Sequence, residues 1–143
     1  EERRTSVRAM EILDDLGVAA HADRLPTALP YAVQKQAALA RALMAAPELL
    51  LLDEPASGLS ESEMSSLGAR IRSLTSTMSV LLVEHHMDLV MSVCDRIVVL
   101  NFGRVIADGT PGAIRANPDV ATAYLGEVVA EASPDAEGGA PDA

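Results

Sequence analysis

The stretch from Leu49 to Leu59, LLLLDEPASGL, decides the fold. Four consecutive leucines between Pro47 and Pro55 are too few to cross a membrane, and they are typical of a buried strand in a parallel sheet covered by helices on both faces. The apolar run stops at two adjacent acids, Asp53 and Glu54. Ligands of open parallel sheets collect beyond the carboxyl ends of the strands. One carboxylate there can hold Mg²⁺ through water and the next can orient or deprotonate an attacking water, or the two acids can simply end the strand and begin a turn.

A second apolar run, from Ser79 to Val83, also ends in polar side chains, here Glu84, His85 and His86. The carboxyl ends of parallel strands share one sheet edge, so we expect Glu54 and His85 to lie along the same edge. An imidazole in that position can donate a hydrogen bond to the γ-phosphate of a nucleotide. Two alternatives are a polar helix start and a zinc site, and zinc is disfavoured because the adjacent histidines diverge without a nearby cysteine or third histidine.

Composition limits the class of protein. The 143 residues suffice for one modest domain, and with 49% apolar but only 2% aromatic residues the core must be aliphatic. A net charge of −10 argues against a nucleic-acid partner, since phosphate backbones bind basic surfaces. Charges and prolines interrupt the longest apolar region, so we expect no direct membrane insertion. One cysteine, Cys94, excludes an internal disulfide and fits a reducing compartment.

Helix and turn signals surround the two acid- and histidine-ended strands. Thr5 or Ser6 is expected to cap a first helix that Gly17 ends, and a second helix is expected over Ala32–Ala46. Ser60 and Glu63 have the spacing of a capping box, which predicts a helix of about four turns through Leu74. A short helix is expected over Met87–Val93.

The last part of the chain predicts a β-hairpin followed by short helices. Its strands are expected at Arg96–Leu100 and Arg104–Ala107, joined by a turn at Asn101–Gly103. Thr110 is expected to cap a short helix over Gly112–Ala116, and Pro118 to begin another. The whole order predicts an α/β fold with a mostly parallel sheet and a C-terminal antiparallel hairpin.

Taken together, these motifs resemble the C-terminal half of an ABC transporter ATPase. LLLLDEPASGL resembles the Walker B strand and D-loop, LLVEHHM the switch-histidine strand, and LPYAVQKQAALARAL the signature motif and its helix. The run DRIVVLNFGRVIADGTPGAIRANPDVATAYLG is similar to the ATP-binding subunits of branched-chain amino-acid importers. The resemblance implies a partial P-loop NTPase domain whose N-terminal half is absent. It would occupy residues 1–126, with the end of the helical subdomain at 1–46, the part from Walker B to the C-terminal helices at 47–126, and a disordered acidic tail at 127–143.

The same resemblance implies ATP and Mg²⁺ as cofactors and assigns roles to residues. Asp53 would hold Mg²⁺ through water, Glu54 would be the general base, and His85 would be the switch residue near the γ-phosphate. The signature loop would reach ATP bound on a second subunit, and the D-loop would contact that subunit. The residues concerned are Pro30, Tyr31, Ala32, Val33 and Gln34 in the signature loop, and Ser57, Gly58, Leu59 and Ser60 in the D-loop.

Three departures from the family pattern stand out. The chain contains no GxxxxGK[ST] phosphate loop, and its one lysine, Lys35, lies within an expected helix. We therefore expect the Walker A half to lie upstream of Glu1, and negligible ATP hydrolysis by these 143 residues alone. Ala32 replaces a glycine that lets backbone approach phosphate, and Ser60 replaces the usual Asp or Asn at the end of the D-loop.

Two hypotheses of function follow from the resemblance. In the first, the parent protein is the ATPase subunit of an importer for branched-chain or other amino acids. It would act as a head-to-tail homo- or heterodimer with a second ATPase subunit, bound to transmembrane permease subunits on the cytoplasmic face of the cell membrane. In the second, the chain is a short non-catalytic module that docks on other subunits. An unrelated α/β domain is a third, less specific interpretation.

Overall fold

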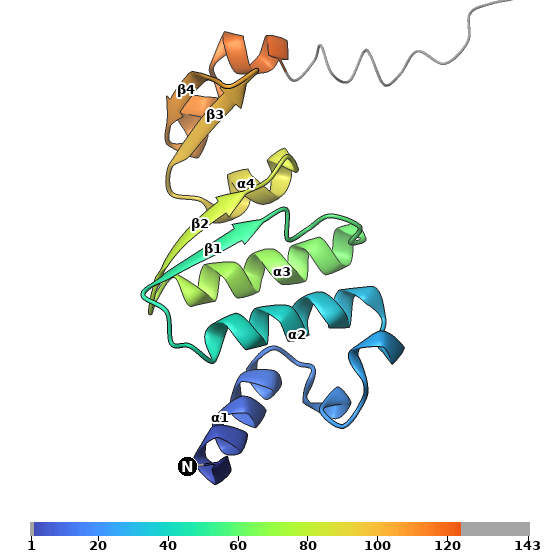
Figure 1. The fold of residues 1–143 in the computed structure, drawn as a ribbon. Coiled ribbons are helices and arrows are strands. Elements are labelled where there is room, and N and C mark those ends of the chain that lie inside the picture. The colour runs from blue at the N-terminus through green and yellow to red at the C-terminus, as the bar shows by residue number, and fades with distance from the viewer. Residues whose placement is uncertain (1, 124–143) are drawn as a thin grey trace, which may run out of the picture. The chain divides into compact units, whose positions relative to one another are not determined.

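The computed structural model describes residues 2–123, which fall into two compact units with the division after Val93 (Figure 1). The first unit contains α1 (Glu2–Asp15), the short 3-10 turns η1 (Ala19–His21) and η2 (Pro26–Ala28), α2 (Tyr31–Leu43), β1 (Leu49–Asp53), α3 (Glu61–Leu74), β2 (Ser79–Val83) and α4 (Met87–Val93). The second contains β3 (Ile97–Asn101), β4 (Arg104–Gly109), α5 (Pro111–Arg115) and a helical segment at 118–123. No helix among residues 2–123 is both long and apolar enough to span a bilayer.

The first unit is built around a two-stranded parallel sheet. β1 pairs with β2 in a register that runs from Leu49 opposite Ser79 to Asp53 opposite Val83. One face of this sheet is covered, because Leu50 is buried in a cluster with Leu39 and Ala40 of α2. The strands, their parallel pairing and the α/β order are as the sequence predicts.

The opposite face of the same sheet carries an apolar surface that the helices of the first unit leave uncovered. Its leucines and valine are each more than half exposed: Leu49, Leu51, Leu81 and Val83, at 55–65%. This differs from the expectation that helices cover both faces. The alternation of side chains along a strand explains the difference, since even-numbered leucines of β1 face α2 while odd-numbered ones face away.

α3 and α4 pack closely because a glycine lies between them. A Cβ atom on Gly68 of α3 would come within 2.9 Å of Leu89 Cδ1 in α4, so a larger residue would require the Leu89 side chain to shift. Arg72 Nη1 also donates a hydrogen bond of 2.9 Å to the Val93 carbonyl at the end of α4. α4 begins directly after His86, so this packing fixes the end of the polar segment that follows β2.

Several local predictions are confirmed, and two differ from the structure. Gly17 takes a left-handed φ of 71° after α1, and Ser60 and Glu63 form the reciprocal capping box at the start of α3. The expected cap at Thr5 or Ser6 is wrong, because α1 already begins at Glu2 and Ser6 Oγ bonds back to the Glu2 carbonyl within the helix. α2 ends at Leu43, three residues before the predicted Ala46.

The second unit is a hairpin with a helix packed on it. β3 and β4 are antiparallel, and their turn has positive φ at both Phe102 (46°) and Gly103 (75°), as a tight two-residue turn requires. Thr110 Oγ1 accepts a bond from the Ala113 amide and caps α5, whose Ile114 is 2% exposed. The hairpin and this cap are confirmed; the predicted tail at 127–143 lies outside the described residues.

Candidate functional site

Glu54 and His85 lie side by side just beyond the paired ends of β1 and β2. The parallel register places Asp53 beside Val83, so the next residues of both strands emerge at the same edge. His85 Nδ1 is 3.6 Å from Glu54 Oε1, and the two side chains are 63% and 55% exposed. A carboxylate and an imidazole are thus available to a ligand in solvent at this edge. Asp53 is exposed too, and by strand alternation it shares the open face of the sheet with Leu49 and Leu51.

Glu54 occupies an unusual backbone conformation. Its φ of 43° is left-handed, which costs a residue with a side chain about 1 kcal/mol or more. Its amide donates to the Val83 carbonyl at 2.8 Å, and its carbonyl accepts from the Ser57 amide at 3.2 Å. The turn therefore begins at the last rung of the parallel sheet and bends the chain sharply, which directs the Glu54 side chain toward the end of β2.

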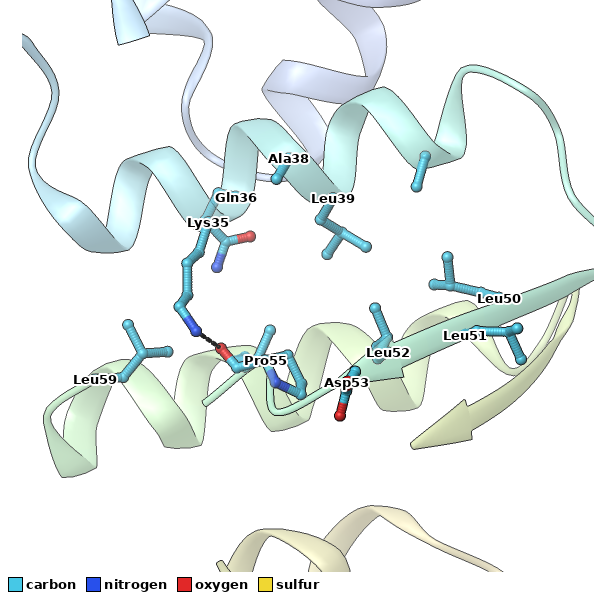
Figure 2. A pocket seen from close by; sticks show the side chains of 12 residues that line it. Lys35, Gln36, Ala38, Leu39, Leu50, Leu51, Leu52, Asp53, Pro55 and Leu59 are labelled. Carbon is cyan, nitrogen blue, oxygen red and sulfur yellow. Dashed lines mark hydrogen bonds between the residues drawn. The ribbon is translucent and has the colours of Figure 1, made fainter. Parts of the chain in front are cut away.

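Lys35 of α2 holds the same turn from another side. Its Nζ donates hydrogen bonds of 3.2 Å to the Glu54 carbonyl and 3.0 Å to the Pro55 carbonyl, the second of which Figure 2 shows. The ammonium also lies 5.3 Å from the centre of the Tyr31 ring. The one lysine of the chain is therefore occupied in positioning the Glu54 loop.

The start of α2 packs against the loop that follows Glu54. Gly58 has a φ of 75°, which favours glycine, and a Cβ atom there would lie 2.9 Å from Tyr31 Cε1, so a larger residue would also displace the ring. Pro30 precedes the helix without a side-chain cap, and Gln34 Nε2 bonds back to the Leu29 carbonyl at 2.9 Å. The predicted signature and D-loop residues thus meet within one chain.

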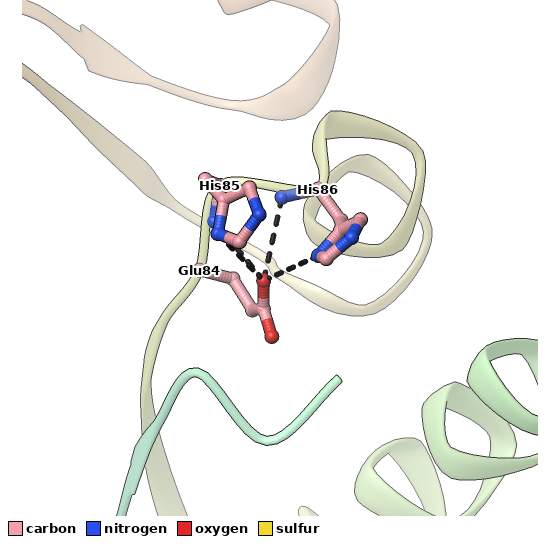
Figure 3. Close-up of side chains that lie close together, drawn as sticks. All are labelled: Glu84, His85 and His86. Carbon is pink, nitrogen blue, oxygen red and sulfur yellow. Dashed lines mark hydrogen bonds and ion pairs between the residues drawn. The ribbon is translucent and has the colours of Figure 1, made fainter. Parts of the chain in front are cut away.

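Glu84 occupies the centre of this edge, between the two loops (Figure 3). Its side chain is 0% exposed. Oε1 accepts from the Ala56 amide at 2.8 Å, across the sheet edge. Oε2 accepts from the amides of His85 at 3.0 Å and His86 at 3.3 Å, and lies 2.8 Å from His86 Nδ1.

These bonds determine the charge of the buried carboxyl group. Burial alone would raise the pKa of Glu84, but the hydrogen bonds from His86, Ala56 and His85 outweigh it and hold the pKa below its usual value. An ionised carboxylate can only accept, so His86 Nδ1 must carry the proton in the bond between them. The ring of His85 makes no such bond. Its Nδ1 lies 3.6 Å from Glu54 Oε1 and 3.7 Å from Glu84 Oε2, and both distances are longer than a hydrogen bond.

The cavity under β1 does not suit a nucleotide. It measures about 300 Å³ and lies between α2, β1 and α3 (Figure 2). Leucines dominate its wall: Leu39, Leu50, Leu52, Leu59 and Leu67. Lys35, the one base in its lining, already donates to two carbonyls. The cavity wall therefore offers an anionic triphosphate no unengaged positive charge.

The acids at the strand end fit a hard divalent cation better than a soft one. Asp53 offers exposed carboxylate oxygens, the ligand type that Mg²⁺ prefers. Glu84, His85 and His86 also place ligand atoms within 4.8 Å of one another. In that group Glu84 Oε2 already accepts bonds from two amides and a ring nitrogen, and the three residues are consecutive, which leaves poor geometry for zinc.

Two residues of this site were not singled out from the sequence. Glu84 could have been found, since it directly follows an apolar strand beside two histidines, but its link to Ala56 depends on the pairing of β1 with β2. Lys35 gave no signal, because a lysine in the first turns of a helix is ordinarily solvated and its carbonyl partners lie 19 and 20 residues away.

Comparison with known proteins gives consistent results over most of the chain. A family model for branched-chain amino acid ATP-binding cassette transporters matches residues 104–130. The high-affinity branched-chain amino acid transport ATP-binding protein BraF of Pseudomonas aeruginosa is 47% identical over 131 residues, covering 87% of this chain and 51% of BraF. LivG of Escherichia coli, described in the same words, is 45% identical over 122 residues, covering 84% of this chain and 48% of LivG. The chain spans about half the length of these curated relatives.

Solved structures give the same result for the fold. The ADP conformation of MJ1267, an ATP-binding cassette of an ABC transporter, matches with a TM-score of 0.79 and 26% identity, covering 88% of this chain and 52% of that one. A nucleotide-free ATP-binding cassette from an ABC transporter matches with a TM-score of 0.77 and 25% identity, covering 87% and 51%. The predicted fold class is thereby confirmed.

Proposed function

We propose, from the premise that this chain belongs to the ATP-binding-cassette family of ABC transporter subunits, that it provides the water-activating edge of an ATPase site. The observation that carries the proposal is the approach of His85 to Glu54, 3.6 Å at the ends of two adjacent parallel strands. The relatives BraF and LivG are described as branched-chain amino acid transport ATP-binding proteins. These descriptions support an importer of branched-chain or other amino acids as the transporter that this chain powers.

The roles of the edge residues follow from their chemistry. Glu54 has an exposed carboxylate that can accept the proton of an attacking water, and its turn is fixed by the amide bond to Val83 and by Lys35. His85 lies beside it with an exposed ring that can donate a hydrogen bond to a γ-phosphate oxygen. Asp53 would hold Mg²⁺ through water, and the ion would neutralise charge on the phosphates.

A second ATPase subunit is proposed to meet the other face of the site. α2 begins after Pro30 without a side-chain cap, so its first amides are available to an anion on a partner. The signature-loop residues would make this contact: Pro30, Tyr31, Ala32, Val33 and Gln34. The D-loop residues would line the subunit boundary: Ser57, Gly58, Leu59 and Ser60. The methyl group of Ala32 reduces the closeness of that approach, and Ser60 already uses its hydroxyl in the α3 capping box.

The open face of the sheet is the proposed place for the phosphate-binding part of the domain. Leu49, Leu51, Leu81 and Val83 are more than half exposed there, on the side of β1 that also bears Asp53. Lys35 is committed to two carbonyls and cannot act as a phosphate-loop lysine. The complete domain would bind permease subunits at the cytoplasmic face of the cell membrane.

The proposal is tested by joining the chain to a phosphate-binding segment. We expect the purified 143-residue chain to hydrolyse ATP at a rate indistinguishable from buffer. Joined to the amino-terminal half of BraF, which the resemblance expects to carry GxxxxGK[ST], it should show Mg²⁺-dependent turnover. If the joined protein folds and binds ATP but shows no turnover, the chain is instead a non-catalytic docking module.

A further inference from the structure

The two loops that carry Glu54 and His85 have few backbone links beyond the sheet. The parallel ladder ends at Asp53 and Val83, with the Glu54 amide giving one more bond to the Val83 carbonyl. From there the two chains run to different helices, α3 and α4. Any further connection between the loops must come from side chains.

Glu84 makes that connection. Its Oε1 bonds the Ala56 amide, 28 residues away in sequence and two residues after Glu54, while its Oε2 bonds the amides of His85 and His86. Ala56 is itself fully buried. One carboxylate thus spans from the first loop to the second, with an oxygen committed to each.

The buried carboxylate of Glu84 depends on its four hydrogen-bond donors. A charged group with 0% side-chain exposure is strongly destabilising unless its oxygens are bonded. Here the four donors come from both loops, and the His86 ring is one of them. If either loop moved away, the carboxylate would lose part of the set that compensates its burial, so the two loops should move together.

We propose that Glu84 is a positioning residue that fixes the Glu54 loop to the His85 loop, so that the two loops open and close as one unit. The inference rests on the proposed function only for what the loops do; the coupling itself requires no nucleotide. A purely local alternative is that Glu84 caps the start of α4 through the His85 and His86 amides alone.

Amide hydrogen exchange of the ¹⁵N-labelled 143-residue chain, resolved by NMR without nucleotide, tests the coupling. In the unmodified chain, the Ala56 and His86 amides should report the same opening free energy. Glu84→Gln keeps the volume but has one acceptor oxygen, so it cannot serve both loops. We expect exchange at Ala56 or at the His85–His86 pair to rise about tenfold or more, and the two opening free energies to separate.

Two further variants sharpen the result. Glu84→Asp keeps the charge but is one methylene shorter; it should retain protection at His85 and His86 while Ala56 exchanges faster. Glu61→Gln removes an equal charge from the exposed first turn of α3 and should leave all three amides unchanged. Unchanged protection at Ala56 in both Glu84 variants, or different opening free energies in the unmodified chain, would overturn the coupling. Neither outcome bears on whether Glu54 supports hydrolysis.

Discussion

Neighbouring residues hold Glu54 in its backbone conformation. Its left-handed φ of 43° costs energy. Its carbonyl accepts hydrogen bonds from Lys35 and Ser57, and its amide donates one to Val83. Strain of this kind persists when the surroundings fix it from several sides, and it is often found where a side chain must be presented to a ligand. The support from Lys35 is the easiest to remove selectively.

Replacing Lys35 by methionine should destabilise the first unit by about 1–2 kcal/mol, since the chain loses two charge-assisted bonds to the Glu54 and Pro55 carbonyls but keeps the aliphatic stem. Urea unfolding followed by circular dichroism measures the change. Arg41→Met, an exposed base in the last turn of the same helix, is the matched control and should change stability little. Equal effects of the two substitutions would mean that the Lys35 bonds contribute nothing specific.

The carboxyl group of Glu84 should make stability depend on pH. Its pKa is lower in the folded chain than the usual 4.5, so its contribution is complete above about that value and is lost as pH falls through the lower folded pKa. Glu54, His85 and His86 are ionisable side chains close to Glu84, so the quantity to compare is the difference in stability between the unmodified chain and Glu84→Gln. Urea midpoints between about pH 7 and pH 3 should converge for the two proteins in acid. A gap that stays constant with pH would contradict this.

Among the elements, α3 shows what a sequence can specify alone. Ser60 Oγ accepts from the Glu63 amide, which completes the reciprocal cap. Glu63 Oε2 accepts from the Ser60 amide and from the Ser60 hydroxyl, and these two bonds to the carboxylate lower the pKa of Glu63. The signal is complete within four residues, so the helix start was predictable. The bounds of β2 and α4 were predicted correctly for the same reason, because their patterns are local.

Ser60→Ala should lower the stability of the first unit by about 1 kcal/mol, through loss of the cap on α3. The comparison is Ser65→Ala on the exposed surface of the same helix, where alanine should be neutral or slightly stabilising. Thermal unfolding monitored at the helix signal gives both values. If Ser60→Ala and Ser65→Ala are equally stable, the cap contributes nothing to the free energy of unfolding.

Other parts of the site required the tertiary fold. The sequence predicted that Glu54 and His85 share an edge, since both follow apolar strands, and the structure places them 3.6 Å apart. The sequence could not predict the hydrogen bond from Lys35 to the Glu54 carbonyl, because that bond depends on how α2 crosses β1. The early end of α2 has a local cause: Ala46 precedes Pro47, which disfavours helical backbone there.

At the scale of the whole molecule, the exposed apolar face of the sheet is the feature of the first unit that its own helices do not explain. Leu49, Leu51, Leu81 and Val83 form an apolar surface on strands that are normally covered on both sides in parallel sheets. The chain spans about half the length of BraF and LivG, and a covering segment supplied by the rest of such a protein would bury this surface. The account therefore predicts that these residues complete a site rather than form one unaided.

The measurement that tests this most directly is a single turnover of ATP by the joined protein described above, with and without Glu54→Gln. The substitution keeps the size of the side chain but removes the base, so ATP binding should be nearly unchanged while hydrolysis slows about 100-fold or more. Glu61→Gln should hydrolyse ATP at the unmodified rate. If Glu54→Gln hydrolyses bound ATP as fast as the parent, Glu54 is not the base and the central claim is wrong.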